Sequence, residues 1–363
     1  MAKFSEVLTI VNGRNQKQVV CDDGKYPIYG SGGIMGYAND YICKAETVVI
    51  GRKGSINKPI FVETPFWNVD TAFGLCANSE KLNPKYLYYF CEKFDFEKLN
   101  TTVTIPSLTK SNLLNVEIPL PNLEKQKQIV ELLDKITSLI SLRKQQLVKL
   151  DELVKVRFVE MFGDCKTNPK NWKTKALEKI ANVGSSKRVF VEELQDSGIP
   201  FYRGTEIGAL AEKKAVIPAL FITEEHYKQL CETTGKPQKG DLLMPSICPD
   251  GRIWIVDTDE PFYFKDGRVL WVHLTSANYN SVFLLYTLKD RIMTDYASIA
   301  SGTTFAELKI FALKKCKIFD VPLELQNQFA NFVERVDQQK QTVQQSLEKL
   351  ELMKKALMQE YFG

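Results

Sequence analysis

Residues 123–163 read LEKQKQIVELLDKITSLISLRKQQLVKLDELVKVRFVEMFG, and residues 323–363 read LELQNQFANFVERVDQQKQTVQQSLEKLELMKKALMQEYFG. Aligned at an offset of 200 positions without a gap, the two stretches are identical at 12 of 41 positions, several times the level expected by chance. The same offset pairs Leu108 with Leu308 and Leu113 with Leu313. The chain therefore contains an internal repeat, and its two halves are predicted to follow one plan.

Each stretch has the apolar spacing of a long helix. Apolar residues recur at alternating steps of four and three, which is the 3.5-residue repeat of a coiled coil. Arg143 interrupts this seam in the first stretch, and Lys340 and Lys354 interrupt it in the second. The predicted seam residues are Ile129, Leu133, Ile136, Ile140, Leu147, Leu150 and Val154 in the first helix, and Phe329, Val333, Val336, Val343, Leu347, Leu350 and Leu357 in the second.

Proline and glycine mark the expected ends of the helices. Pro121 and Pro322 suit the helix entrances, where a missing N–H costs no hydrogen bond, and Gly163 suits the stop of the first helix. One interpretation is two independent amphipathic helices, each on its own domain. Two helices with similar exposed seams more simply bury those seams against each other. We therefore expect an antiparallel pair that holds two domains apart at a defined distance.

The helices divide the rest of the chain into two domains with a parallel plan. GIPFYRGTEI in the second half stands where YPIYGSGGIM stands in the first, and KGDLLMPSICPDGRIWIV stands where AETVVIGRKGSI stands. Short β-branched and aromatic runs between turns predict strands, and each set precedes an aromatic-rich helix. The predicted fold class is α+β: two mixed α/β domains, two long antiparallel coiled-coil helices and a pseudo-twofold repeat. The predicted segments are a first domain at 1–117, a central helix at 118–164, a second domain at 165–318 and a distal C-terminal helix at 319–363.

Composition limits the classes of protein to consider. The chain has 363 residues, a formal net charge of +4 and 8 cysteines, none of them in a C-x-x-C pair. A mildly basic balance permits nucleic-acid binding without demonstrating it. His226 and His273 have no second plausible ligand near them in the sequence, so we expect no metal site. Because no long apolar run occurs, we expect a cytoplasmic protein that does not enter a membrane.

The order domain, helix, domain, helix resembles the specificity (S) subunit of type I restriction-modification systems over essentially the whole chain. The resemblance is carried by IPLPNLEKQKQIVELL and VPLELQNQF with the helices that follow them, and by the pattern GRKGSI–P–PFWNVDTAF. It implies that 1–117 and 165–318 are target-recognition domains, each reading one half of a split site in double-stranded DNA, while the helices set the gap.

The same resemblance implies which molecules accompany the chain. The helices would dock methyltransferase (M) subunits, two in number, and it stays open whether restriction/translocase (R) subunits join them. S-adenosylmethionine, ATP and Mg²⁺ would belong to those partners, so we expect no cofactor on this chain. The function implied is to choose the bipartite site that the partner subunits methylate or cleave.

The sequence contains no catalytic constellation. The glycine-rich stretch YPIYGSGGIMGY at 26–37 gives G-x-G-x-x-x-G, which is one residue too long for a dinucleotide-binding fingerprint. NPKY at 83–86 lacks the second proline of a methyltransferase loop. His273 lies inside the apolar run VLWVHLT and is predicted to be a strand residue. We therefore expect a chain that is not an enzyme.

Loops that carry hydrogen-bond donors beside flexible backbone are the candidates for DNA contact. Glycine lets a backbone approach phosphate closely, and arginine can bind guanine O6 and N7 together. Any one loop could be an ordinary solvated turn, but candidates recur at corresponding places in both halves. The predicted DNA-contact residues are Tyr29, Ser31, Arg52, Lys53, Ser55, Thr102 and Thr104 in the first domain, and Lys187, Arg188, Arg203, Thr205, Ser246, Arg252, Thr303 and Thr304 in the second.

Two other classes of function stay open from the sequence. One is a non-catalytic coiled-coil scaffold or adaptor that binds protein partners without reading DNA. The other is a metal-dependent nuclease built on Asp250, whose only plausible partners, Glu307 and Lys309, lie far downstream. An aspartate before glycine is more typical of a turn than of a metal site. The repeat and its paired loops favour DNA recognition over both.

Overall fold

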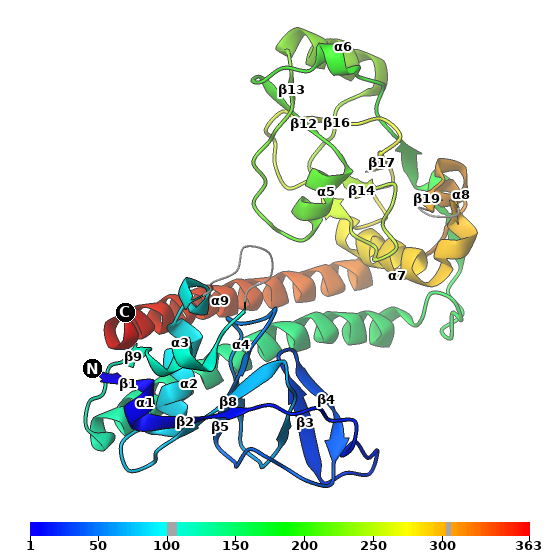
Figure 1. Cartoon of the computed structure of the whole chain (residues 1–363). Coiled ribbons are helices and arrows are strands. Elements are labelled where there is room, and N and C mark those ends of the chain that lie inside the picture. The colour runs from blue at the N-terminus through cyan, green and yellow to red at the C-terminus, as the bar shows by residue number, and fades with distance from the viewer. Residues whose placement is uncertain (100–106, 303–305) are drawn as a thin grey trace. The chain divides into compact units, whose positions relative to one another are not determined.

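The structure is a computed structural model that describes residues 1–99, 107–302 and 306–363 (Figure 1). The chain divides into two compact units, the first made of Met1–Leu147 with Thr342–Gly363 and the second of Val148–Gln341. Two 40-residue helices, α4 (Leu123–Phe162) and α9 (Leu323–Phe362), contribute to both units. Each unit therefore contains the start of one long helix and the end of the other.

The first unit is built on a four-stranded antiparallel sheet in the order β2–β8–β5–β6. Val48, Val49 and Ile50 on β5 are fully buried, as expected for an apolar strand covered on both faces. A three-stranded sheet, β4–β3–β7, and a β1–β9 pair complete the strands. The bounds are β1 (Ala2–Lys3), β2 (Leu8–Asn12), β3 (Tyr26–Gly30), β4 (Gly33–Ala38), β5 (Thr47–Gly51), β6 (Ile60–Val62), β7 (Trp67–Asn68), β8 (Ala72–Ala77) and β9 (Glu117–Ile118).

Helices close the core of the first unit. They are α1 (Phe4–Val7), α2 (Pro84–Lys93), the 3-10 helix η1 (Phe96–Leu99) and α3 (Lys110–Leu114). Asn83 caps α2, because its Oδ1 accepts hydrogen bonds from the N–H groups of Lys85 and Tyr86 at 2.9 and 3.1 Å. Tyr86 and Phe90 pack against Phe362, with ring centroids 4.9 and 6.1 Å away. The end of α9 is thus part of this core.

The second unit has a four-stranded antiparallel sheet in the order β11–β17–β14–β15 and a three-stranded sheet in the order β13–β12–β16. Two further pairs, β10–β20 and β18–β19, lie outside these sheets. The bounds are β10 (Thr174–Ala176), β11 (Ala181–Gly184), β12 (Ile199–Tyr202), β13 (Phe221–Ile222), β14 (Leu242–Pro245), β15 (Trp254–Ile255), β16 (Tyr263–Phe264), β17 (Val269–Leu274), β18 (Ala300–Ser301), β19 (Glu307–Leu308) and β20 (Lys317–Phe319).

The two units correspond strand for strand. β12 pairs in parallel with β16 as β3 pairs with β7, and β14 lies between β15 and β17 as β5 lies between β6 and β8. The chain departs from the repeat after β12, where α5, β13 and α6 replace the hairpin of β3 and β4. The helices are η2 (Leu177–Lys179), η3 (Val191–Glu193), α5 (Gly204–Ala211), α6 (Glu224–Thr234), α7 (Ser281–Ile299) and α8 (Ile310–Lys314). The predicted α+β fold with an internal repeat is confirmed.

In the second unit, α4 and α9 pair antiparallel. Nζ of Lys340 lies 2.5 Å from Oδ1 of Asp151, and the ring centroids of Phe158 and Phe329 are 5.4 Å apart. Residues nearer the C-terminus of α4 therefore contact residues nearer the N-terminus of α9. Lys340 is a predicted interruption of the seam, and the carboxylate of Asp151 compensates its charge.

In the first unit, the pairing of the two helices is marked by Lys144 and Glu351, whose Nζ and Oε1 lie 2.8 Å apart. Lys354, the other interruption in α9, extends to α2, where its Nζ lies 3.0 Å from Oε2 of Glu92. Both lysines that interrupt the α9 seam thus lie beside carboxylates, which avoids the cost of an isolated buried charge. The predicted antiparallel coiled coil is confirmed.

The predicted seam residues lie on the covered side of both helices. Ile140, Leu147, Leu350 and Leu357 are half-buried, and the other predicted members are buried. Gly163 follows the last residue of α4 with φ +85°, and its N–H donates to the carbonyl of Val159 at 2.7 Å. This left-handed conformation favours glycine and ends the helix as the sequence predicts. In the described part of the chain, none of the helices combines the length and apolarity of a membrane span.

A buried glutamine ties the start of each long helix to its domain. Oε1 of Gln126 accepts from the N–H of Asn83 at 2.8 Å, and its Nε2 donates to the carbonyls of Lys81 and Pro121 at 2.9 and 2.8 Å. Asn83 is also the N-cap of α2, so α2 and α4 share one polar junction. Gln326 makes the equivalent bonds in the second unit, to Asn280, Asn278 and Val321.

Replacing Gln126 by leucine should lower the free energy of unfolding by about 3 kcal/mol, because one N–H and two carbonyls lose their partner where water is excluded. Urea unfolding of the full chain measures this effect through the midpoint of the transition that involves the first unit. Gln128→Leu is the matched control, since Gln128 is exposed on the same helix. Equal midpoints for the two variants would show that the buried glutamine does not stabilise the junction.

Candidate nucleic-acid interface

The loop after β5, residues 52–55, is held by backbone hydrogen bonds on both sides. The N–H of Arg52 donates to the carbonyl of Thr71 at 2.8 Å, and the carbonyl of Arg52 accepts from the N–H of Leu108 at 2.9 Å. Gly54 has φ +76°, a conformation that glycine adopts without strain. The backbone is therefore fixed by its own groups, while the side chains of Arg52 and Lys53 are exposed.

The tip of the β3–β4 hairpin lies against this loop. A Cβ placed on Gly51 would lie 3.0 Å from Cβ of Ser31, so the two segments are in direct contact. Tyr29 is half-buried because its ring packs edge-on against Phe66, with centroids 5.3 Å apart. The structure thus brings five predicted DNA-contact residues to one end of the first unit's sheets: Tyr29, Ser31, Arg52, Lys53 and Ser55.

The loop after β14 in the second unit is anchored in the same way. The N–H of Ser246 donates to the carbonyl of Arg268 at 2.9 Å, and its carbonyl accepts from the N–H of Leu308 at 2.7 Å. Ser246 therefore takes the place of Arg52, and Arg268 takes the place of Thr71. Ser246 is only 2 % exposed, so its side chain lies below the surface that a DNA duplex would touch.

The three arginines of the second unit that are predicted to contact DNA have carboxylate partners. The nitrogen–oxygen distances are 3.3 Å for Arg188 and Asp266, 2.6 Å for Arg203 and Glu206, and 2.8 Å for Arg252 and Asp250. In the parts of the chain that the structure describes, neither Arg52 nor Lys53 has a carboxylate within ion-pair distance. The two units therefore present different chemistry on the same backbone frame.

The pair of Arg203 and Glu206 shows how strongly such an arginine is held. Burial alone would raise the pKa of Glu206, but hydrogen bonds from Arg203 and Thr205 outweigh burial and lower that pKa to about 2. The hydroxyl of Thr205 lies 2.8 Å from Oε2 of the same carboxylate. Glu206 is thus ionised at neutral pH, and a phosphate or base must compete with it for the guanidinium and the hydroxyl.

Several predicted DNA-contact residues of the second unit lie on segments that contact the turn joining β16 to β17, residues 265–268. Oγ of Ser185, close in sequence to Lys187 and Arg188, accepts from the N–H of Gly267 at 2.9 Å. A Cβ on Gly204 would lie 3.2 Å from the carbonyl of Arg268, which places the start of α5, with Arg203 and Thr205, at the same turn. Lys187 and Arg188 are exposed.

Sequence reasoning missed Arg268. This side chain is exposed, and its guanidinium pairs with the carboxylate of Glu307. The only available signal was that KDGR at 265–268 aligns with the turn that contains Thr71 in the first half. Arg268 is thus a further cation at the edge of the second unit's loops.

Other predicted residues fall elsewhere. Thr102, Thr104, Thr303 and Thr304 lie outside the described residues. Asp250 lies in a turn before Gly251, which has φ +66°, and it pairs with Arg252. Within the described residues, no three His, Cys, Asp or Glu side chains are grouped so that they could hold a metal ion.

Comparison with known proteins identifies relatives along nearly the whole chain. The family model described as "Type I restriction modification DNA specificity domain" matches residues 1–152 and 169–352. A type I restriction enzyme specificity subunit of Haemophilus influenzae is 27% identical, covering 92% of this chain and 86% of the relative. The MjaVIII specificity subunit of Methanocaldococcus jannaschii is 24% identical, covering 86% of this chain and 75% of the relative.

Solved structures show the same fold. An S subunit of a type I restriction-modification system from M. genitalium superposes with a TM-score of 0.61 at 17% identity, covering 100% of this chain and 95% of that chain. A second structure, from a study of complex assembly and conformational transition of the type I system, gives a TM-score of 0.62 at 16% identity. It covers 99% of this chain and 96% of that chain.

Arg52→Ala should weaken binding to duplex DNA roughly tenfold, because the exposed guanidinium, which lies 5.8 Å from the centroid of the Phe73 ring, has no carboxylate partner to leave among the described residues. Arg252→Ala should weaken it less, since Arg252 must first leave Asp250. Fluorescence anisotropy at one fixed salt concentration compares the variants. Arg335→Ala removes the same charge from an exposed position on α9 and is the control. An Arg52 variant that binds like the control would remove this loop from the interface.

Proposed function

The chain belongs to the family of type I restriction-modification DNA specificity proteins, and from this premise we propose that it reads a DNA target in two halves, one with each globular domain. The family membership confirms the DNA-specificity function that the sequence predicts. The division of the target between the two domains is our proposal. It treats the loops after β5 and β14 as equivalent parts of two separate recognition surfaces.

One observation carries this proposal: the two loops share an anchor and differ in side chains. Arg52 and Ser246 each donate to a carbonyl on the strand-joining turn and accept from a leucine N–H. The first loop then exposes RKGS at 52–55, whereas the second exposes a turn in which Arg252 is paired with Asp250. Base edges are distinguished by the side chains that reach them, so two differently equipped surfaces suit two different half-sites.

The long helices are proposed to set the gap between the half-sites. Each has 40 residues, or about 60 Å at 1.5 Å per residue, and each contributes to both units. The length of a helix is set by its number of residues, so the spacing that it imposes would be constant. This role matches the sequence-based expectation that the helices hold the two domains apart at a defined distance.

Partner subunits are proposed to supply the chemistry. The family acts in restriction-modification, whereas this chain is its DNA specificity component. α4 exposes apolar side chains in each unit, including Leu139 and Leu142 in the first and Val156 and Val159 in the second. Such exposed residues on a helix are suited to packing against partner helices. We assign this role to methyltransferase subunits, two in number, which would hold S-adenosylmethionine, with ATP and Mg²⁺ on any restriction subunit.

Inserting one heptad into both helices should lengthen the required gap by about three base pairs, because seven residues add about 10 Å and a base pair rises 3.4 Å. The insertions belong between Lys144 and Asp151 in α4 and between Lys340 and Glu351 in α9, which keeps both ion pairs. Selection of bound sequences from a random DNA pool measures the gap. Both half-sequences should stay the same, and an unchanged gap would contradict the proposal that the helices set the gap.

The alternative of a scaffold that does not touch DNA predicts a different response to salt. Phosphate contacts release counterions, so the affinity of a DNA-binding chain for random duplex falls linearly with salt on logarithmic axes. A gel shift between about 50 and 200 mM salt should show a loss of at least tenfold. Absence of any shift at low salt would favour the scaffold over the proposed function.

A further inference from the structure

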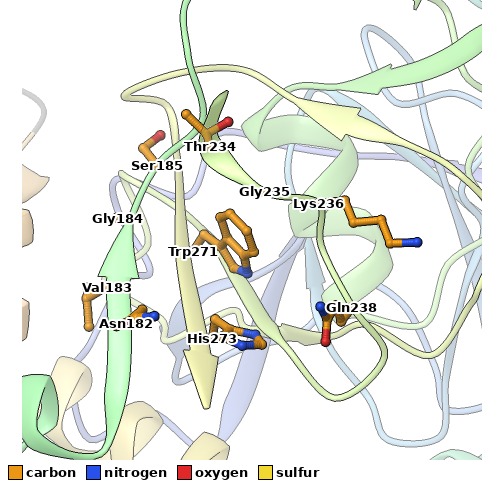
Figure 2. A pocket seen from close by; sticks show the side chains of 10 residues that line it. All are labelled: Asn182, Val183, Gly184, Ser185, Thr234, Gly235, Lys236, Gln238, Trp271 and His273. Carbon is orange, nitrogen blue, oxygen red and sulfur yellow. The ribbon is translucent and has the colours of Figure 1, made fainter. Parts of the chain in front are cut away.

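A pocket of about 380 Å³ opens beside β11 and β17 in the second unit (Figure 2). None of its main residues was predicted to contact DNA. Figure 2 shows the Trp271 ring in the middle of the group, with residues of β11 on one side and residues that follow α6 on the other. The lining of the pocket includes Asn182, Gly184, Lys236, Gln238, Trp271 and His273.

A buried carboxylate organises this pocket. Asp241, whose side chain is 3 % exposed, accepts from Nε1–H of Trp271 at 2.7 Å and from the N–H of Gln238 at 2.8 Å through Oδ2. Its Oδ1 lies 2.8 Å from Nδ1 of His273. One group therefore fixes both rings and the segment that carries Lys236. In a neutral His273 ring with the proton on Nδ1, Nε2 is an acceptor.

The face of β11 beside Trp271 is left empty by a glycine. Gly184 lies opposite Trp271, and Asn182 lies opposite His273, in the antiparallel β11–β17 pair, so these four positions share one face. A Cβ on Gly184 would have no atom within 4 Å. Across the ring, a Cβ on Gly235 would lie 3.3 Å from Cη2 of Trp271. The indole also packs edge-to-face against Phe264, with ring centroids 5.9 Å apart, and open space remains beside Gly184.

The first unit provides an internal comparison, because its equivalent strands lack this pocket chemistry. The first unit has Val11 at the position of Gly184. Opposite Val11, at the position of Trp271, it has Gly74. Thr47 and Cys76 occupy the places of the carboxylate and the histidine, with Oγ1 and Sγ 3.2 Å apart. A Cβ on Gly74 would lie 2.7 Å from Sγ of Cys43, which fills the space. The fold therefore forms without the tryptophan, aspartate and histidine of the second unit.

We propose that this pocket binds one unstacked nucleotide. A base would stack on Trp271, with its polar edge on the amide of Asn182 and the imidazole of His273, and its phosphate would meet the exposed ammonium of Lys236. Two sources share this chemistry: a base turned out of a bound DNA strand, and a free nucleotide. The DNA source rests on the proposed function, whereas binding of a free nucleotide does not.

The test uses Gly184→Val in the full chain. Valine is the residue at the equivalent position of the first unit, it suits a strand, and Gly184 has no neighbour that a Cβ would strike. Thr174→Val, on the exposed strand β10, is the matched control. Titration with 2-aminopurine deoxyribonucleoside monophosphate, followed by its fluorescence, should show saturable binding to the wild type and the control. Gly184→Val should bind at least about tenfold more weakly, as expected when one base loses its stacking.

Asn182→Ala is a second pocket variant, which tests the proposal even if Gly184→Val fails to fold. Asn182 is an exposed surface residue, so its replacement should not disturb the core. It should weaken mononucleotide binding several-fold. Equal affinity of the wild type and both pocket variants would overturn the proposal. The proposal would also be overturned if both pocket variants changed only the binding of a methyltransferase subunit and not the binding of the mononucleotide.

A second titration with a single-stranded oligonucleotide and a duplex distinguishes the sources. Weaker binding of these DNAs by Gly184→Val identifies the DNA strand as the source, and a change confined to the mononucleotide identifies a free nucleotide. A wild-type chain that binds no DNA would contradict the proposed function. The mononucleotide titration would still decide whether the pocket is a nucleotide site.

Discussion

The structure depends on the burial of two phenylalanines at the ends of the long helices. Phe362 of α9 packs against Tyr86 and Phe90 in the first unit. Phe162 of α4 packs against Phe283 and Phe329 in the second, with centroids 4.8 and 5.5 Å apart. Each core is therefore completed by a helix that begins in the other unit. Losing either helix end would open a core and expose its aromatic rings.

The paired helices could be predicted because their signal is local and periodic. Steps of three and four residues identify the seam, and Gly163 identifies a stop, without knowledge of any distant contact. The position of Ser246 could not be predicted in the same way. Its burial follows from β14 lying between β15 and β17 and from the hydrogen bond with Leu308, which is 62 positions away (308 − 246).

The pocket in the second unit escaped prediction for the same physical reason. Asp241 and Trp271 are separated by 30 positions, and only the register of β11, β14 and β17 brings them together. The sequence did predict that His273 lies on a strand, and the structure places it on β17. It could not show that a buried carboxylate holds the ring. Side-chain identity is readable from the sequence, but partners across a sheet depend on the register.

The domains illustrate how one backbone frame can carry different recognition chemistry. The frame is held by backbone groups, which are present whatever the side chains are. Arg52 is exposed without a carboxylate partner among the described residues, whereas Arg203 and Arg252 are paired. Side chains on these loops can therefore differ between the two units while the strand pairing stays the same. This separation of frame and contact residues is what the proposed reading of a different half-site by each domain requires.

The central claim is that this chain directs its partners to a split DNA sequence. Mapping methylated bases in DNA from cells that express the chain with its methyltransferase subunit tests this claim most directly. The account predicts methylation within one motif, made of two short defined sequences separated by an undefined gap of constant length. Methylation at a single continuous motif, or a methylation pattern that is the same without the chain, would contradict it.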